Sequence, residues 1–119
     1  MSEADDPAGL PPILAAQVEL IRSQFDQAGA APAEDLLRYV DAAVLNICEH
    51  AETSMPLLNR VMGLRAAAEG LSQVLEAGPE GEDDRQAALV RAHAELAALE
   101  EALAVARPSA IIVALGLGW

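Results

Sequence analysis

The sequence predicts an all-α protein: an up-and-down bundle of four amphipathic helices followed by a short extended apolar C-terminal tail. Three observations support this fold class. Apolar residues recur at alternating spacings of three and four in four separate segments, which is the period of a helix face. Pro and Gly residues mark the boundaries between these segments. The aromatic residues are one Phe, one Tyr and one Trp, so the core must consist mainly of Leu, Ile, Val and Ala, which suits packed helices more than sheets.

The boundaries divide the chain into three parts. These are a disordered acidic lead over 1–9, a helical bundle over 10–107 and an apolar C-terminal tail over 108–119. Pro11 and Pro12 open the first helix, because the N–H groups of a first turn have no intrahelical partner, and Gly29 ends it. Pro32 opens the second helix. The expected buried faces of these two helices are Leu14, Val18, Ile21 and Phe25, and then Leu37, Val40, Val44 and Ile47.

The third and fourth helices have their own start signals. Ser54 is the expected N-cap of the third helix, with Pro56 in its first turn. Asp83 or Asp84 is the expected N-cap of the fourth, and Pro108 ends that helix. Their expected buried faces are Leu57, Val61, Leu64, Ala68, Leu71 and Leu75, and then Leu89, Ala92, Leu96, Leu99, Leu103 and Ala106. Short connections predict antiparallel neighbours, and the many Ala residues leave thin interfaces, which favours a homo-oligomer.

Composition excludes several classes of function. The net charge of −12 opposes binding to nucleic acid or to an anionic membrane surface. No apolar run reaches the roughly 20 residues of a membrane span. The single cysteine, Cys48, cannot form a disulfide within the chain, and no secretory signal is present, so we expect a cytoplasmic protein.

The sequence offers no catalytic constellation. His50 is expected near the C-terminus of the second helix, where the helix dipole stabilises a cation, and His93 is expected at the edge of the core. Cys48 follows a buried position and has no base that the sequence places beside it. We therefore expect no enzyme, no metal site and no cofactor. The second helix region, from Glu34 to Glu52, is acidic and is expected either to be a solvated face or to dock a partner.

The last ten residues, "AIIVALGLGW", contain no polar side chain. Their β-branched residues and glycines predict an extended segment. A strand would place Ile111, Val113, Leu115, Leu117 and Trp119 on one face, and Ile112, Ala114, Gly116 and Gly118 on the other. We expect the bulky face to be buried, because it would otherwise promote aggregation. Three interpretations remain open: the tail completes its own core, binds another protein, or is the substrate of an enzyme.

The third interpretation is supported by a resemblance to a known family of peptides. The run resembles the apolar, Val-, Ile- and Gly-rich cores of borosins, which are ribosomally made peptides whose backbone amides are N-methylated by a dedicated methyltransferase. The resemblance covers about the last ten residues, and in split borosin systems a helical recognition domain precedes such a core. It implies methylation sites among Ile111, Ile112, Val113, Ala114, Leu115, Gly116 and Leu117.

Taken together, these observations predict a non-enzymatic helical interaction or adaptor protein. It would bind a protein partner through an acidic bundle face, through the tail, or through both. The alternative is a borosin-like precursor whose helical domain recruits a modifying methyltransferase.

Overall fold

The computed structural model describes residues 10–28, 33–77 and 81–116. The predicted disordered lead, and the tail residues Leu117, Gly118 and Trp119, lie outside the described residues. The described residues form five helices and no strand. The helices are α1 (Pro12–Asp26), α2 (Ala33–His50), α3 (Met55–Glu76), α4 (Glu82–Ala104) and α5 (Ala110–Ala114). Within these ranges, none of the helices has the length and apolarity that crossing a bilayer requires.

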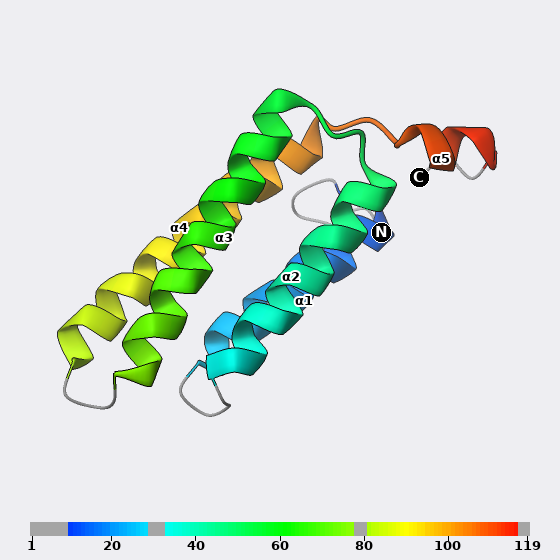
Figure 1. Ribbon diagram of the computed structural model, residues 1–119. Helices are drawn as coiled ribbons and strands as arrows, with labels where there is room; N and C mark the ends of the chain where they lie inside the picture. Colours follow the sequence, from blue (N-terminus) through cyan, green and yellow to red (C-terminus); the bar gives the residue numbers. More distant parts are fainter. Residues whose placement is uncertain (1–9, 29–32, 78–80, 117–119) are drawn as a thin grey trace, which may run out of the picture.

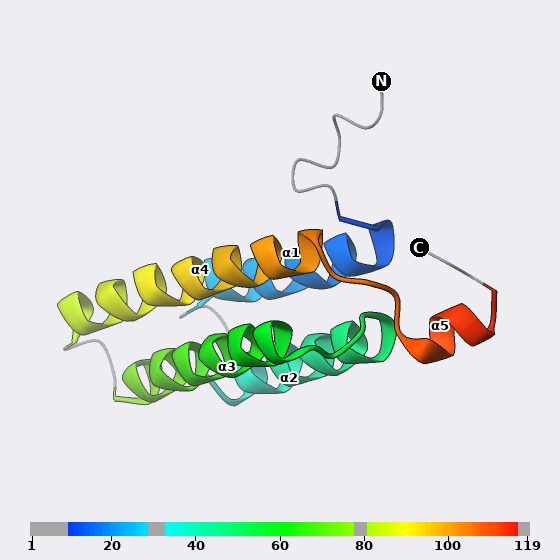
Figure 2. The ribbon, with the colours of Figure 1, turned by 90° about the horizontal axis from the view of Figure 1, so that it is seen from above.

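The four long helices form an up-and-down arrangement (Figure 1). Each runs antiparallel to the one before it, and α4 returns beside α1 to close the set. Viewed from above, α1 and α4 form one layer and α2 and α3 the other (Figure 2). The predicted antiparallel packing of four helices is therefore correct, and α5 is an addition to it.

The core is made of aliphatic side chains from all four long helices, together with Phe25. On α1 the buried residues are the four that the sequence predicts, Leu14, Val18, Ile21 and Phe25. On α2 the prediction is off by one position at two places. Leu36 and Ala43 are buried there, whereas Leu37 and Val44 are half-buried and pack against the edge of the core. A small residue such as Ala43 lets neighbouring helices approach closely, and the larger Val44 is accommodated at the flank.

Two of the helix ends test the predicted capping signals. Ser54 is the N-cap of α3, and its side chain accepts a hydrogen bond from the Leu57 N–H. The prediction for α4 is wrong, because this helix already begins at Glu82 and Gly81 occupies the N-cap without a side-chain bond. The aspartates expected as caps lie in the first turn instead. Carboxylates are favourable there through the helix dipole alone.

The prediction of an extended tail is also wrong, because Ala110–Ala114 is helical. Ser109 is the N-cap of this helix, and its hydroxyl oxygen accepts a hydrogen bond from the Ile112 N–H at 3.3 Å. Gly116 follows the C-cap residue Leu115 with φ of 72°, the left-handed conformation in which glycine commonly ends a helix. The low helix propensities of Ile and Val disfavour this helix by less than about 0.7 kcal/mol per residue relative to Ala. The Ser109 N-cap and the left-handed Gly116 after the C-cap are enough to offset this cost.

Candidate functional site

The C-terminal segment is attached to the bundle at the C-terminus of α2. The Ser109 hydroxyl donates to the Glu49 carbonyl at 2.7 Å, and the Ser109 N–H donates to the His50 carbonyl at 2.8 Å. Glu49 and His50 are the last residues of α2, so their carbonyls have no partner within the helix. The Glu52 N–H also donates to the Arg107 carbonyl at 2.7 Å. These bonds fix the position from which α5 leaves the bundle.

Beyond this attachment, α5 makes little contact with the rest of the protein. Of the described helices, it packs only against α2, and it projects from the end of the bundle (Figures 1 and 2). Ile112 is buried, with 7% of its surface exposed. By contrast, Ile111, Val113 and Leu115 are 63%, 62% and 65% exposed. The described part of the segment is therefore a short apolar helix and its C-cap residue, with one large side chain buried and three large side chains exposed.

This arrangement reverses the predicted orientation of the segment. The face expected to be buried contains Ile111, Val113 and Leu115, and the structure exposes all three. The buried residue, Ile112, belongs to the face expected to be bare, because a helix turns about 100° per residue whereas a strand alternates. Among residues 110–116 only Ile112 is buried, and it lies outside the continuous core cluster, so the described part of the tail contributes little to the bundle core. Ala114 and Gly116 are exposed, and Leu117 and Trp119 lie outside the described part of the chain.

The acidic face predicted on the second helix is partly neutralised. Asp35 pairs with Arg38 at 2.5 Å within α2. Asp41 pairs with Arg65 at 2.7 Å, which joins α2 to α3. Exposed pairs of this kind typically contribute less than about 1 kcal/mol. They nevertheless leave this face less negative than the sequence suggests.

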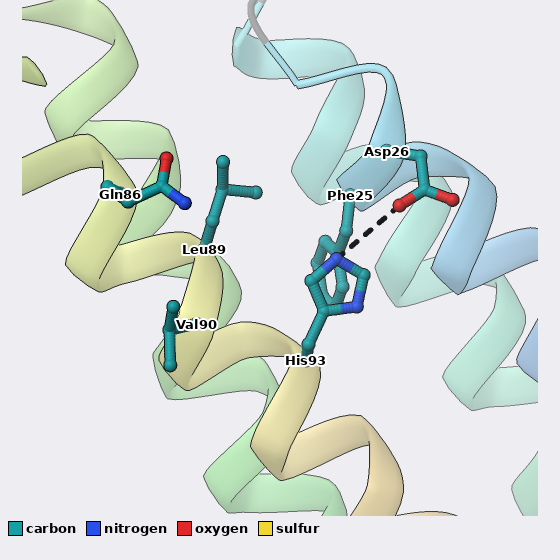
Figure 3. Close-up of a pocket in the computed structure, with 6 residues that line it drawn as sticks. All are labelled: Phe25, Asp26, Gln86, Leu89, Val90 and His93. Carbon is teal, nitrogen blue, oxygen red and sulfur yellow. Dashed lines mark ion pairs between the residues drawn. The ribbon is translucent and has the colours of Figure 1, made fainter.

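A second candidate surface is a shallow hollow of about 400 Å³ between the C-terminal end of α1 and the first half of α4 (Figure 3). Its lining combines apolar side chains with a carboxylate, an amide and an imidazole. The lining residues are Phe25, Asp26, Gln86, Leu89, Val90 and His93. Val90 is 62% exposed, whereas Phe25 is almost fully buried and forms the base. This hollow was not predictable from the sequence, because its residues come from two helices that are distant along the chain.

His93 joins the two sides of this hollow. Its Nε2 lies 3.5 Å from Oδ1 of Asp26, and its ring meets the Phe25 ring edge-on with centroids 5.6 Å apart (Figure 3). Both partners are at the end of α1, so His93 holds α4 against that end. This agrees with the predicted place of His93 at the edge of the core.

Cys48 and His50 have local environments that the structure explains. Cys48 is half-buried, and this burial raises the pKa of its thiol, while a hydrogen bond with Thr53 acts in the opposite direction. The thiol is therefore less often ionised than an exposed one, and the thiolate is the nucleophilic form. His50 Nδ1 lies 2.8 Å from the Asn46 carbonyl oxygen, one helical turn earlier. Within residues 10–28, 33–77 and 81–116, no group of three or more His, Cys, Asp or Glu side chains is placed to hold a metal ion.

Comparison of the chain with protein-family models, with curated proteins and with solved structures found no match.

Proposed function

We propose that the protein is a non-enzymatic interaction module that presents its C-terminal segment to a protein partner. The observation that carries this proposal is the exposure of three large apolar side chains on a segment attached only at its base. Burying one such side chain contributes about 1.5–3 kcal/mol. Ile111, Val113 and Leu115 together therefore offer enough apolar surface for a specific contact.

The surroundings of α5 indicate the kind of partner. Glu49 and Glu52, beside the attachment point, are both exposed. The segment itself contains no charged residue after Arg107. A partner groove with an apolar floor and a basic rim would match this pattern, because opposite charges at an interface rim steer association.

Site-specific photo-cross-linking tests the proposal. A photoreactive residue is placed at Ile111 in the full chain, and a control carries the same residue at Ala97, on the exposed surface of α4. We expect an identified protein to cross-link from position 111 and not from position 97. The purified partner should then bind the wild type, and bind Ile111→Asp/Leu115→Asp at least about tenfold more weakly, since a large apolar contact is lost. Equal cross-linking from both positions would contradict the proposal.

A borosin-like precursor is the second candidate function. It is favoured by the small contact between α5 and the rest of the bundle. A five-residue helix is marginal by itself, so a modifying enzyme can unwind it at low cost. Two of its amides donate within the helix region: Val113 N–H to the Ser109 carbonyl and Leu115 N–H to the Ile111 carbonyl, each at 3.0 Å. N-methylation would remove these donors, so the modified segment would no longer be helical.

Intact-mass measurement tests this second candidate. Co-expression with a methyltransferase that modifies the chain should add increments of one methylene. Fragmentation should place them among residues 111–117, the range that the resemblance implies. The variant lacking residues 110–119 is the control and should remain unmodified. Methyl groups on side chains outside that range would contradict the precursor function.

A further inference from the structure

Ser109 joins two helices that are distant along the chain. Its hydroxyl oxygen accepts the Ile112 N–H as the N-cap of α5, and the same hydroxyl donates to the Glu49 carbonyl. Its backbone N–H donates to the His50 carbonyl. The last four carbonyls of a helix have no partner within that helix. Ser109 therefore satisfies two of these four carbonyls at the end of α2 while it also starts α5.

The two segments that meet at Ser109 also pair through their backbones. Ala51 and Pro108 form an antiparallel bridge, and the Glu52 N–H donates to the Arg107 carbonyl at 2.7 Å. Ala51 is fully buried, and its own N–H donates to the Ile47 carbonyl in the last turn of α2. The connection from α2 to α3 thus lies against the connection from α4 to α5 (Figure 1).

The position of Ser109 depends in turn on α5. The Ser109 carbonyl accepts the Val113 N–H at 3.0 Å, so the first turn of α5 engages both the hydroxyl and the carbonyl of Ser109. Ile112 is buried, and α5 packs against α2. A helix of five residues is marginal by itself, so its order depends on these bonds and on this contact. The bonds that order α5 and the bonds that cap α2 therefore share one residue.

We propose that Ser109 couples the order of α5 to the order of the last turn of α2. This inference goes beyond the proposed interaction function, because it concerns what changes inside the bundle when α5 is engaged. A partner that binds α5 in place keeps both sets of bonds. Displacement of α5, or loss of its helix, withdraws the donors from the α2 carbonyls, and the last turn of α2 then opens more often. The state of α5 is thereby transmitted to the junction between α2 and α3.

Amide hydrogen exchange at the Ala51 N–H measures this opening, because that amide donates to the last turn of α2. Val113→Pro is the perturbation. Proline removes the N–H that donates to the Ser109 carbonyl, and it disfavours the helical conformation of the residue before it. The Val113 side chain is 62% exposed, so its replacement removes little packing from the bundle. Exchange at Ala51 should accelerate at least about fivefold, since at least one hydrogen bond to the end of α2 is lost.

Val113→Ala is the matched control, because it shortens the same side chain and keeps the N–H. Exchange at Ala51 in this variant should match the wild type. A second amide reports on general destabilisation: the Ala77 N–H donates to the Gln73 carbonyl at the end of α3 that is remote from α5 (Figure 1). Exchange at Ala77 should be unchanged in both variants.

Ser109→Ala tests the route of the coupling. It removes the hydroxyl bonds to both helices, so exchange at Ala51 should accelerate without the proline. Adding Val113→Pro to this variant should then accelerate exchange less than it does in the wild-type background, because the two changes act on shared bonds. The proposal is overturned if Val113→Pro leaves Ala51 exchange unchanged, accelerates Ala77 exchange equally, or has the same effect with and without the Ser109 hydroxyl. Cross-linking from position 111 is measured separately, so a failure of this coupling is distinguishable from a failure of the interaction function.

Discussion

Deleting residues 110–119 should leave the four-helix bundle folded and only slightly less stable. The deletion removes α5, in which Ile112 is the one buried side chain among the described residues. All of the continuous core lies outside the deleted segment. We therefore expect a loss far smaller than the removal of a core element would cause.

The magnitude follows from that one side chain. Full burial of an Ile contributes about 1.5–3 kcal/mol, from which the entropy of ordering the side chain, about 0.5–1 kcal/mol, must be subtracted. The backbone hydrogen bonds of so short a helix add little to the free energy of unfolding by themselves. The free energy of unfolding should fall by about 1–2 kcal/mol. Deleting 108–119 also removes the bonds from Ser109 to Glu49 and His50, which should cost a further 1–2 kcal/mol or so, at about 1 kcal/mol for each bond.

Urea denaturation followed by circular dichroism at a low protein concentration measures both losses. Leu99→Ala is the reference, because Leu99 is fully buried in α4 and its truncation should cost about 2–5 kcal/mol. The order of stability should be wild type, then the chain ending at Ser109, then the chain ending at Arg107. A loss on deleting 110–119 that equals or exceeds that of Leu99→Ala would show that α5 is part of the core and would refute this reasoning.

Two further predictions concern the bundle itself. Gly70→Ala should raise the free energy of unfolding by about 0.5–1 kcal/mol, because a Cβ there meets no atom within 4 Å and Ala is the better helix former. Gly63→Ala should gain less, because its Cβ would lie 2.6 Å from Oε1 of Glu95, and urea titrations of the two variants compare them. Cys48 should react with iodoacetamide more slowly than a small free thiol at pH 8, because burial raises its pKa. For the same reason the folded state retains the thiol proton to higher pH than the unfolded chain. The contribution of the protonated Cys48 thiol to the free energy of unfolding is therefore complete below the ordinary thiol pKa. It is lost as the pH rises through the raised pKa of the folded state, whereas the Cys48→Ser variant should not show this loss of stability.

The fold was predictable because each long helix contains its own signals. The Leu, Ile and Val positions of α1 and α3 recur at helical spacing, and the Ser54 cap follows from a local preference that needs no tertiary information. The start of α4 was misjudged because Asp83 and Asp84 are equally suited to a cap and to a first turn. Which role they take depends on where Gly81 turns the chain.

The candidate surfaces were less predictable. The composition of the tail marks it as unusual, but its β-branched residues and glycines predicted the wrong conformation for Ala110–Ala114. Ser109 followed by an apolar run and then Gly116 is a start and stop signal that could have indicated α5. The hollow could not be found from sequence, since Phe25 and His93 approach each other only after α1 and α4 pack together.

The strong negative charge and the exposed α5 are best understood together. Three neighbouring apolar side chains in solvent favour indiscriminate association, which charge repulsion between like molecules opposes. Repulsion acts at a distance, whereas apolar attraction requires close contact and matching shape. Only a surface that fits the segment closely recovers enough free energy to overcome the repulsion. The acidic bundle would thereby make α5 selective in the ligand role that we propose for it, and lowering the net charge should broaden the range of surfaces that it binds.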